Sequence, residues 1–300
     1  NDGFIRRMPI DTFKKQRRGG KGVIGMSSKR EDFVKMMITA SMHDIIFLFS
    51  NKGKIFALKI YEIPVASKNS RGKSLKGLIN LASGEEISAI CAISDFEENQ
   101  YLCFATKHGI LKKTDVNVFS NAKKGGIIAI NLKKDDELVD VKLVGKKDDI
   151  VIGSSNGLLL RTNLSKMRSM GRSAAGIIGM RLASDDKIIA MDLVKANSSL
   201  FVISEKGFGK RVNFQNFTAK GRGGKGMAYI KVSDKNGKAV GLRSVLLNDE
   251  IIIIAKSGMT IRLLAKDIST QGRATVGVKL IDIKDGDIVS DFAVISDVKE

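Results

Sequence analysis

The chain has 300 residues, with 51 Lys or Arg against 32 Asp or Glu, so its formal net charge is +19. A charge of this size favours a polyanionic partner, with nucleic acid first and an anionic membrane second. The longest apolar runs, such as 45–49 and 251–255, are too short to span a bilayer, and no long basic amphipathic helix or targeting segment is visible. We therefore expect a cytoplasmic protein that has no membrane partner.

Strand–turn–strand patterns run along the whole chain. Short apolar and β-branched runs broken by a glycine turn are typical of β-hairpins, as in 249–268. A Gly-x-apolar-x-basic unit marks them in chain order: GFIRR (3–7), a degenerate GKIFA (53–57), GILKK (109–113), GLLLR (157–161), GFGKR (207–211) and GMTIR (258–262). The first glycines are 50, 56, 48, 50 and 51 residues apart. A period near fifty predicts a propeller-like array of four-stranded units.

A second glycine follows each hairpin and precedes a short apolar strand: Gly22, Gly77, Gly126, Gly176, Gly226 and Gly277. The two series of glycines agree on six units, so we predict a single all-β domain over 1–300, a six-bladed ring of four-stranded antiparallel blades. The chain begins in the back half of a unit and ends in the front half of one. We therefore expect a fragment of a longer polypeptide, whose ring closes when the N-terminal strand pairs into the last blade.

Every loop before the second glycine carries cations. Equivalent positions of equivalent repeats occupy equivalent places around a ring, so these loops should share one rim. About ten residues later the charge reverses, at Asp32, Glu86, Asp136, Asp186 and Asp287, which should mark a different edge. The predicted DNA-binding residues of the rim loops are Lys14, Lys15, Lys68, Arg71, Lys73, Lys76, Lys123, Lys124, Lys166, Arg168, Arg172, Lys220, Arg222, Lys225 and Arg273.

Residues that could carry catalysis or bind a metal are scarce. The GKS triplet at 72–74 lacks the earlier glycine of a Walker A loop, because Ser67 stands there. The two histidines, His43 and His108, fall near hairpin turns, and Cys91 and Cys103 read as buried apolar residues. We expect no catalytic residue, no metal site and no cofactor in this chain.

The heptapeptide QRRGGKG at 16–22 combines three cations with three glycines. Together with the sixfold repeat, it resembles the C-terminal domain of the A subunit of bacterial DNA gyrase, whose gyrase A box has this consensus. The resemblance extends over the whole chain, including HDIIFLFSNKGKIFALKIYEIP (43–64) and GKRV (209–212), and a weaker copy of the box, KGRGGKG, stands at 220–226. The residues of the box, which the resemblance assigns to DNA binding, are Gln16, Arg17, Arg18, Gly19, Gly20, Lys21 and Gly22.

The resemblance implies a β-pinwheel whose basic rim binds, bends and wraps duplex DNA with fixed handedness, without regard to sequence. It implies that the box links the last blade to the first. It also implies an A2B2 complex that uses the wrapped DNA for ATP-dependent strand passage and negative supercoiling. DNA cleavage would belong to an N-terminal region outside these 300 residues and ATP hydrolysis to the B subunit. We expect the isolated domain to be monomeric.

Two alternatives stay open. The C-terminal domain of topoisomerase IV is related, but it usually has fewer blades and a degraded box. A kelch-like protein-interaction propeller also has a period near fifty, but its blades are rich in Tyr and Trp, whereas this chain has three Tyr and no Trp.

Overall fold

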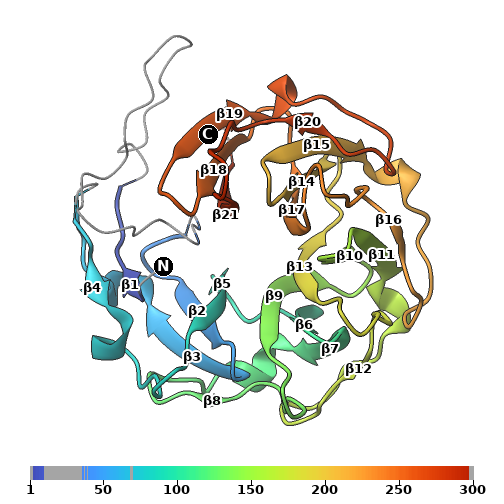
Figure 1. Cartoon of the computed structure of the whole chain (residues 1–300). Helices are drawn as coiled ribbons and strands as arrows, with labels where there is room; N and C mark the ends of the chain where they lie inside the picture. The colour runs from blue at the N-terminus through green and yellow to red at the C-terminus, as the bar shows by residue number, and fades with distance from the viewer. Residues whose placement is uncertain (1–2, 10–35, 37, 39, 68–69, 297–300) are drawn as a thin grey trace.

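The computed structural model describes residues 3–9, 36, 38, 40–67 and 70–296. Small antiparallel sheets stand side by side around a central axis, like the blades of a propeller (Figure 1). The structure is therefore all-β and propeller-like, as the sequence predicts.

One blade shows how the chain builds each sheet. It contains β5 (Ile87–Ile93), β2 (Ile45–Ser50), β3 (Lys54–Lys59) and β8 (Ile127–Ile128), in that order from the inside of the ring to the outside. Strands β2 and β3 form the hairpin, and β5 follows it in sequence. The chain then builds the next hairpin before it returns to place β8 on the outer edge of the first blade. Each blade is thus completed by a strand from the following repeat.

Three more blades repeat this order and a fifth lacks an outer strand among the described residues. They are β9 (Leu138–Gly145), β6 (Gln100–Thr106), β7 (Ile110–Asp115) and β12 (Ile177–Ile178); β13 (Ile188–Leu193), β10 (Asp149–Ser154), β11 (Leu158–Asn163) and β16 (Met227–Ala228); β17 (Ala239–Val245), β14 (Ser199–Ser204), β15 (Phe208–Asn213) and β20 (Val278–Lys279); and β21 (Val289–Ile295), β18 (Glu250–Ala255) and β19 (Thr260–Leu264).

Short 3₁₀ helices follow most hairpins. They are η2 (Ile60–Glu62), η4 (Val116–Phe119), η5 (Leu164–Lys166), η6 (Phe214–Asn216) and η7 (Ala265–Asp267), with η3 (Leu75–Gly77) after an outer strand instead.

The N-terminal strand does not pair where we expected it. Strand β1 (Phe4–Ile5) pairs with β4 (Lys73–Ser74) in a sheet of their own, with Phe4 opposite Ser74, and not with the last blade. The two strands match the outer half of a blade, because the Leu75 N–H donates to the Gly3 carbonyl at 2.8 Å just as the Ala129 N–H donates to Gly53. The described residues therefore contain five blades and this two-stranded sheet, not six four-stranded blades, and they do not include the closure of the ring.

The second series of glycines also needs one correction. Gly126 has a φ of +74° and directly precedes the outer strand β8. In the first repeat this place belongs to Gly72, with a φ of +82° directly before β4, whereas Gly77 lies in η3. A Cβ on Gly72 would lie 2.5 Å from the Ile5 carbonyl oxygen, so the close approach of loop and strand requires glycine there. Spacing alone had selected the wrong glycine.

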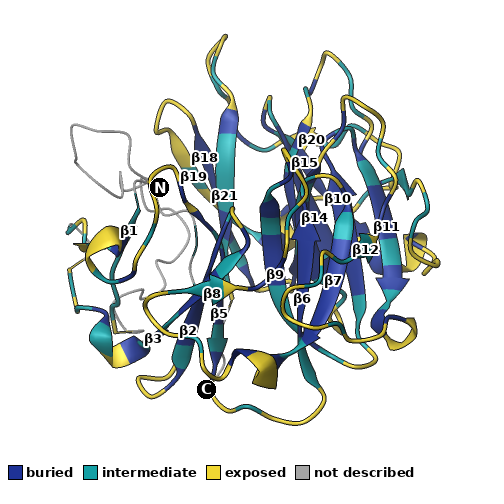
Figure 2. Ribbon diagram, turned by 90° about the horizontal axis from the view of Figure 1, so that it is seen from below, coloured by how far each residue is buried: buried dark blue, intermediate teal, exposed yellow. Residues whose placement is uncertain are grey.

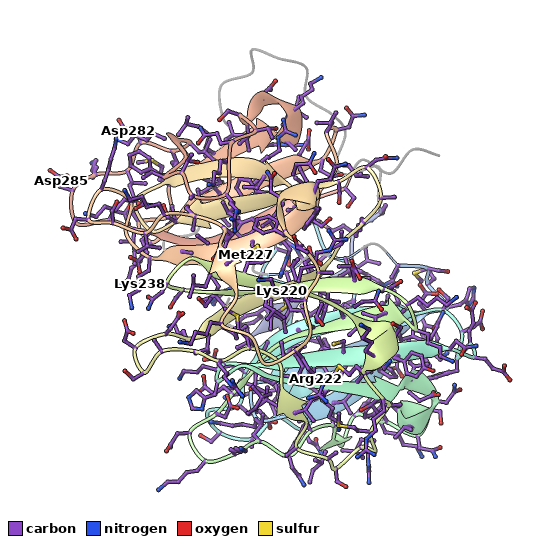
Figure 3. The ribbon with its side chains drawn as sticks, turned by 90° about the vertical axis from the view of Figure 1, so that its right-hand side faces the viewer. Lys220, Arg222, Met227, Lys238, Asp282 and Asp285 are labelled. Atoms are coloured by element: carbon purple, nitrogen blue, oxygen red, sulfur yellow. The ribbon has the colours of Figure 1, made fainter. Side chains whose placement is uncertain are left out.

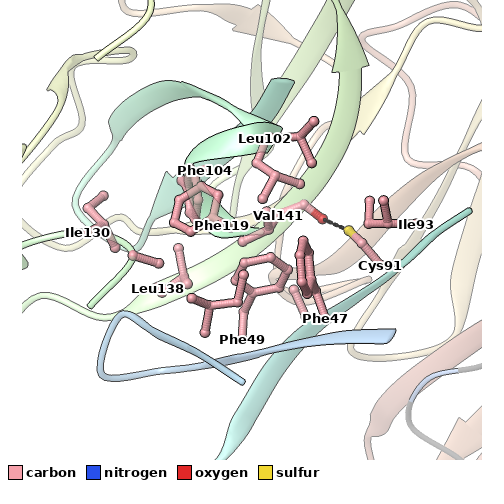
Figure 4. Close-up of a cluster of buried hydrophobic side chains, with 14 residues drawn as sticks. Phe47, Phe49, Cys91, Ile93, Leu102, Phe104, Phe119, Ile130, Leu138 and Val141 are labelled. Carbon is pink, nitrogen blue, oxygen red and sulfur yellow. Dashed lines mark hydrogen bonds between the residues drawn. The ribbon is translucent and has the colours of Figure 1, made fainter. Parts of the chain in front are cut away.

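The hydrophobic core lies between adjacent blades. Phe47 and Phe49 of β2 pack against Phe104 of β6, and the rings of Phe49 and Phe104 meet edge to face at 5.7 Å (Figure 4). Both faces of a hairpin strand are covered in this way, which explains why these strands are continuously apolar in sequence. The strands are accordingly buried and the turns exposed (Figure 2). Cys91 and Cys103 lie inside, and burial raises the pKa of each thiol to about 12.

Candidate nucleic-acid interface

The predicted rim cations that the structure describes all lie on the surface. Each basic loop leads from a 3₁₀ helix to an outer strand, so the loops lie along the circumference of the ring (Figure 1). Figure 3 looks onto this edge and shows Lys220 and Arg222 on it. The exposed cations of these loops are Arg71, Lys73, Lys76, Lys123, Lys124, Lys166, Arg168, Arg172, Lys220, Arg222, Lys225 and Arg273. The sequence-predicted residues are thus brought to one edge.

Backbone hydrogen bonds join successive loops along this edge. The Gly223 N–H donates to Gly179 at 2.6 Å, and the Arg181 N–H donates to Gly224 at 3.0 Å. Three further contacts of this kind link other neighbouring repeats: Asn80 to Lys124 at 3.0 Å, Asn131 to Ala174 at 3.4 Å and Lys231 to Thr275 at 3.0 Å. The basic loops are therefore fixed relative to one another from residue 80 to residue 275. We call this outer edge, with its loops 70–76, 122–126, 165–176, 219–226 and 269–277, the basic belt.

Glycine lets the belt lie close against the blades. Gly226 has a φ of +81°, and a Cβ there would lie 2.8 Å from the Leu159 carbonyl oxygen. Gly224 is also constrained, since its Cβ would lie 3.1 Å from the Leu160 side chain. Gly224 and Gly226 therefore allow close packing of the loop, while its Arg222 and Lys225 are exposed.

Three of the predicted acidic positions, Asp136, Asp186 and Asp287, serve the fold, and Asp32 lies outside the described residues. Asp186 is buried and accepts from the Ser155 hydroxyl at 2.9 Å and from the Asn156 and Lys187 N–H groups at 3.0 and 2.8 Å. The same hydroxyl-to-carboxylate bond joins Thr106 to Asp136 at 2.7 Å and Ser257 to Asp287 at 2.5 Å. These carboxylates fix the hairpin turns, so we call this edge the turn edge.

The turn edge departs from the predicted pattern in two repeats. Glu86 is exposed, and it is its neighbour Glu85 that is buried and accepts from the Ser50 hydroxyl at 2.5 Å. In the repeat between β16 and β17, the equivalent position holds Asn236 and not an acidic residue. Asn236 is buried and accepts a hydrogen bond from the Ser233 hydroxyl at 3.0 Å. In Figure 3, Asp282, Asp285 and Lys238 lie toward one flat face, away from Arg222. The charges of the turn edge are therefore separated from the basic belt.

The basic residue that ends the Gly-x-apolar-x-basic unit has a structural role in three successive repeats. Arg161 donates to the Phe214 and Phe217 carbonyls at 3.1 and 3.3 Å, and so holds the η6 turn of the next repeat. Lys113 and Arg211 make the equivalent bonds, to Leu164 at 2.7 Å and Ile268 at 2.9 Å. Burial lowers the pKa of both Lys113 and Arg211. These cations tie neighbouring repeats together and are not part of the belt.

The comparisons with known proteins agree with this architecture. A family model described as "DNA gyrase C-terminal domain, beta-propeller" matches six segments: 1–39, 44–91, 100–144, 148–195, 198–245 and 249–296. The chain belongs to the DNA gyrase A C-terminal domain family. The A subunit of DNA gyrase from Leptospira biflexa is 59% identical over 294 residues, which cover 98% of this chain and 35% of that protein. The chain thus spans about a third of the length of this relative.

Solved structures show the same fold. The structure of a DNA gyrase A C-terminal domain has a TM-score of 0.81 and 28% identity, covering 98% of this chain and 97% of that one. The C-terminal domain of DNA topoisomerase IV also has a TM-score of 0.81, at 24% identity, covering 98% and 90%. At 24% identity, the likeness to topoisomerase IV shows the fold alone. The match to the gyrase family model excludes the kelch-like propeller considered from the sequence.

The most specific mark of the gyrase A family in this sequence lies outside the described residues. The gyrase A box at 16–22, with Lys14, Lys15 and Lys68, falls in the parts of the chain that the structure leaves undescribed. The geometry of the belt therefore rests on the other loops.

The residues weighed for catalysis have structural places. Lys73 and Ser74 of the GKS triplet form β4, so they do not form a phosphate-binding loop. His108 is exposed at a hairpin turn, where its backbone N–H donates to the Asp136 carboxylate at 3.0 Å. Within the described ranges, no three His, Cys, Asp or Glu side chains gather as metal ligands would. No helix in the described part of the chain has the length and apolar character needed to cross a bilayer.

Proposed function

We propose that this chain is the DNA-wrapping domain of a gyrase A subunit. The observation that carries the proposal is the basic belt, in which exposed cations at equivalent positions of successive repeats lie on one outer edge. Backbone hydrogen bonds fix the spacing of these loops, so the positive charge follows a rigid curve. A curved belt suits a long polyanion that bends around the molecule.

The energy of bending shows why several loops are needed. A 300-residue globule has an outer radius of roughly 25 Å, which places the axis of a wrapped duplex at roughly 35 Å. Half a turn is then about 110 Å of DNA, whose elastic cost is on the order of 13 kcal/mol. At about 1 kcal/mol for each phosphate contact, roughly a dozen contacts offset this cost. One loop cannot supply that number, whereas the belt can.

Binding of this kind is independent of sequence, because phosphates carry no base identity. Its affinity should fall steeply with salt, since every phosphate neutralised by Lys or Arg releases condensed counterions.

The box and the sixth blade complete the proposal. Six segments match the family model, and β1 with β4 supplies the outer half of a further blade, so we infer a six-bladed ring. Residues 16–22 occupy the same position in their repeat as residues 220–226 do in theirs, and the cations of 220–226 are exposed on the belt. We assign Arg17, Arg18 and Lys21 to phosphate binding in the loop that joins the last blade to the first.

Within the whole enzyme, this domain would bend a DNA segment around itself with fixed handedness and present it for strand passage. We place DNA cleavage in the remainder of the gyrase A polypeptide and ATP hydrolysis in the B subunit of an A2B2 complex, which acts on chromosomal DNA in the bacterial cytoplasm. The domain by itself needs no metal or cofactor for this role and acts as a monomer.

A salt titration of DNA binding tests the proposal. Two triple variants each remove three positive charges: K220A/R222A/K225A from the basic belt and K134A/K187A/K238A from exposed lysines near the turn edge. The belt variant should reduce the slope of log K against log salt by about 2.7, which corresponds to three phosphates. The control should stay near the wild-type slope. Equal losses in both variants would refute a localised belt, because only net charge would then matter.

A further inference from the structure

Two lysines are completely buried beneath the basic belt. Lys112 of β7 and Lys210 of β15 each stand three residues after a hairpin glycine, and neither side chain reaches solvent. Fully buried lysines are rare in proteins unless they are paired or hydrogen-bonded. What they contact therefore indicates why they are there.

Both lysines hold the backbone of a belt loop. Lys210 Nζ donates to the Gly272, Arg273 and Thr275 carbonyls at 2.6, 2.9 and 2.9 Å, and it lies 2.9 Å from Thr275 Oγ1. Four oxygens thus surround a group that has three N–H donors when protonated. Burial lowers the pKa of Lys210 to about 8, which leaves the ammonium form dominant at neutral pH.

Lys112 repeats the arrangement two repeats earlier. Its Nζ donates to the Ala129 carbonyl at 2.6 Å and to the Arg172 carbonyl. It also lies over the Phe104 ring, 5.4 Å from the centroid. Burial, and then the neighbouring Arg172, lower the pKa of Lys112 to about 8. Arg6, at the same place after Gly3, donates to the Ser70 carbonyl in the loop that carries Arg71.

Two other described repeats have an apolar residue in place of this cation, and it packs against the belt loop. Leu160 stands three residues after its hairpin glycine, and the belt loop packs directly onto it through Gly224. Phe56 has the same place and packs against Gly126, where a Cβ would lie 2.4 Å from the ring. Cations and apolar residues alternate at this position along the chain: Arg6, Phe56, Lys112, Leu160, Lys210 and Ile261. The two described loops with a glycine pair, 122–126 and 219–226, lie over Phe56 and Leu160, and the loops held by Lys112 and Lys210 have no such pair.

We propose that Lys112 and Lys210 are positioning residues, which hold the backbone of two belt loops so that Arg172 and Arg273 face the DNA. The inference rests on the proposed function. Each lysine binds the backbone carbonyl of the arginine it positions, while that arginine is exposed. The buried charge thus acts on DNA only through the exposed one.

A double-mutant cycle on the 300-residue chain tests this relation. K210M, R273A, R222A, K210M/R273A and K210M/R222A would be titrated with duplex DNA of random sequence across a range of salt. R273A and K210M should each reduce the salt slope by about 0.9, one phosphate, although Lys210 itself is inaccessible to DNA. The double variant should match R273A alone, because the lysine acts through that arginine. K210M combined with R222A should instead show the sum of the two losses.

A second readout follows the loop itself. Amide hydrogen exchange in 271–277 should become faster in K210M, with exchange in 219–226 unchanged. K238M removes an exposed lysine near the turn edge and should alter neither segment. The cycle of K112M with R172A provides an independent repeat at the other lysine.

The outcomes separate the inference from the proposed function. If R273A and R222A both bind DNA as the wild type does, the basic belt itself is wrong. If they bind weakly while K210M binds normally, or if K210M and R273A are additive, the positioning role is wrong and the belt stands. Methionine should be tolerated, because its unbranched, flexible side chain fills the space of the buried lysine stem. Unfolding of both K210M and K112M would also overturn the inference, since the lysines would then serve the fold and not the loops.

Discussion

The basic belt and the turn edge are built from the same repeat, yet charge serves opposite purposes in them. At the turn edge, Asp136 and Asp186 are buried and accept hydrogen bonds from hydroxyl and backbone groups of the hairpin. On the belt, Arg222 and Lys225 are exposed on a loop whose shape is set by glycines. The carboxylates of the turn edge therefore stabilise the fold, whereas the cations of the belt are available to a partner. Removing each kind should have effects that do not overlap.

The largest effect on DNA wrapping is expected from the gyrase A box at 16–22. This loop occupies the same position in its repeat as the belt loops do, although it lies outside the described residues. R17A/R18A/K21A should abolish the change in linking number that wrapping produces, because three adjacent phosphate contacts are lost at one place. Nicked circular DNA sealed by ligase in the presence of the chain measures this change. If these cations serve DNA binding and not the fold, the melting temperature should stay within about 2 °C of the wild type. A variant that wraps DNA fully would remove the box from the mechanism.

The belt variant K220A/R222A/K225A should lower DNA affinity about 100-fold at moderate salt, since each phosphate contact contributes about 1 kcal/mol. Its free energy of unfolding should change by less than about 0.5 kcal/mol. Fluorescence anisotropy and urea denaturation give the two numbers. A large loss of stability with little loss of affinity would show that these cations belong to the fold.

The turn edge should respond in the opposite way. D186A leaves the Ser155 hydroxyl and two N–H groups without their acceptor, so we expect a loss of about 3 kcal/mol in the free energy of unfolding. DNA affinity per folded molecule should not change. D185A is the matched control, because its exposed carboxylate binds only the Asn156 side chain and Lys238. Equal destabilisation by D185A would contradict the assignment.

Substitution of Arg161 tests the structural role of the cations that tie neighbouring repeats together. R161M keeps the aliphatic stem but removes the donors to Phe214 and Phe217 and the ion pair with Asp149, so we expect a loss of about 2 kcal/mol in stability. The salt slope of DNA binding should remain that of the wild type, because this guanidinium is not on the belt. A slope reduced by about 0.9 would instead make Arg161 a phosphate ligand.

The smallest effect concerns pH. The hydrogen bond from Ser257 is the main cause that lowers the pKa of Asp287 below its usual 3.8. A carboxyl with a lowered pKa in the folded state contributes stability above its unfolded pKa, and that contribution is lost as pH falls through the folded value. S257A should therefore weaken the dependence of stability on pH below about 4, as followed by thermal melts in acid. An unchanged acid profile would show that the bond does not favour the ionised form.

The sequence predicted the ring because its turns require glycine. Gly157, with a φ of +81° and a Cβ position 2.4 Å from the Ile230 carbonyl oxygen, has no substitute, so the hairpin glycines recur at a fixed period. The spacing of glycines did not identify the one that precedes the outer strand, as with Gly72 and Gly77. Only the backbone conformation distinguishes them. The pairing of β1 with β4 was missed, because strand exchange between repeats leaves no mark in a single sequence.

Charge was predicted less well than shape. The cations of the belt were found because they share a phase and stand beside glycines. Lys112 and Lys210 stand at the variable fourth position of the Gly-x-apolar-x-basic unit and were given no role, because nothing in the sequence distinguishes a lysine that lies beneath a loop from one that lies on it. Asp186 was read only as one of the acidic positions that mark a second edge, for the same reason. Its partner Ser155 is thirty-one residues away, and only the folded ring brings them together.

The central claim is that the position of the belt cations, and not net charge, makes this domain wrap DNA. The most direct measurement is the linking number of ligated nicked circles, compared at equal occupancy for K220A/R222A/K225A and K134A/K187A/K238A. The account predicts that the turn-edge variant shifts the linking number as the wild type does and that the belt variant loses most of the shift. The same shift in both variants would contradict it.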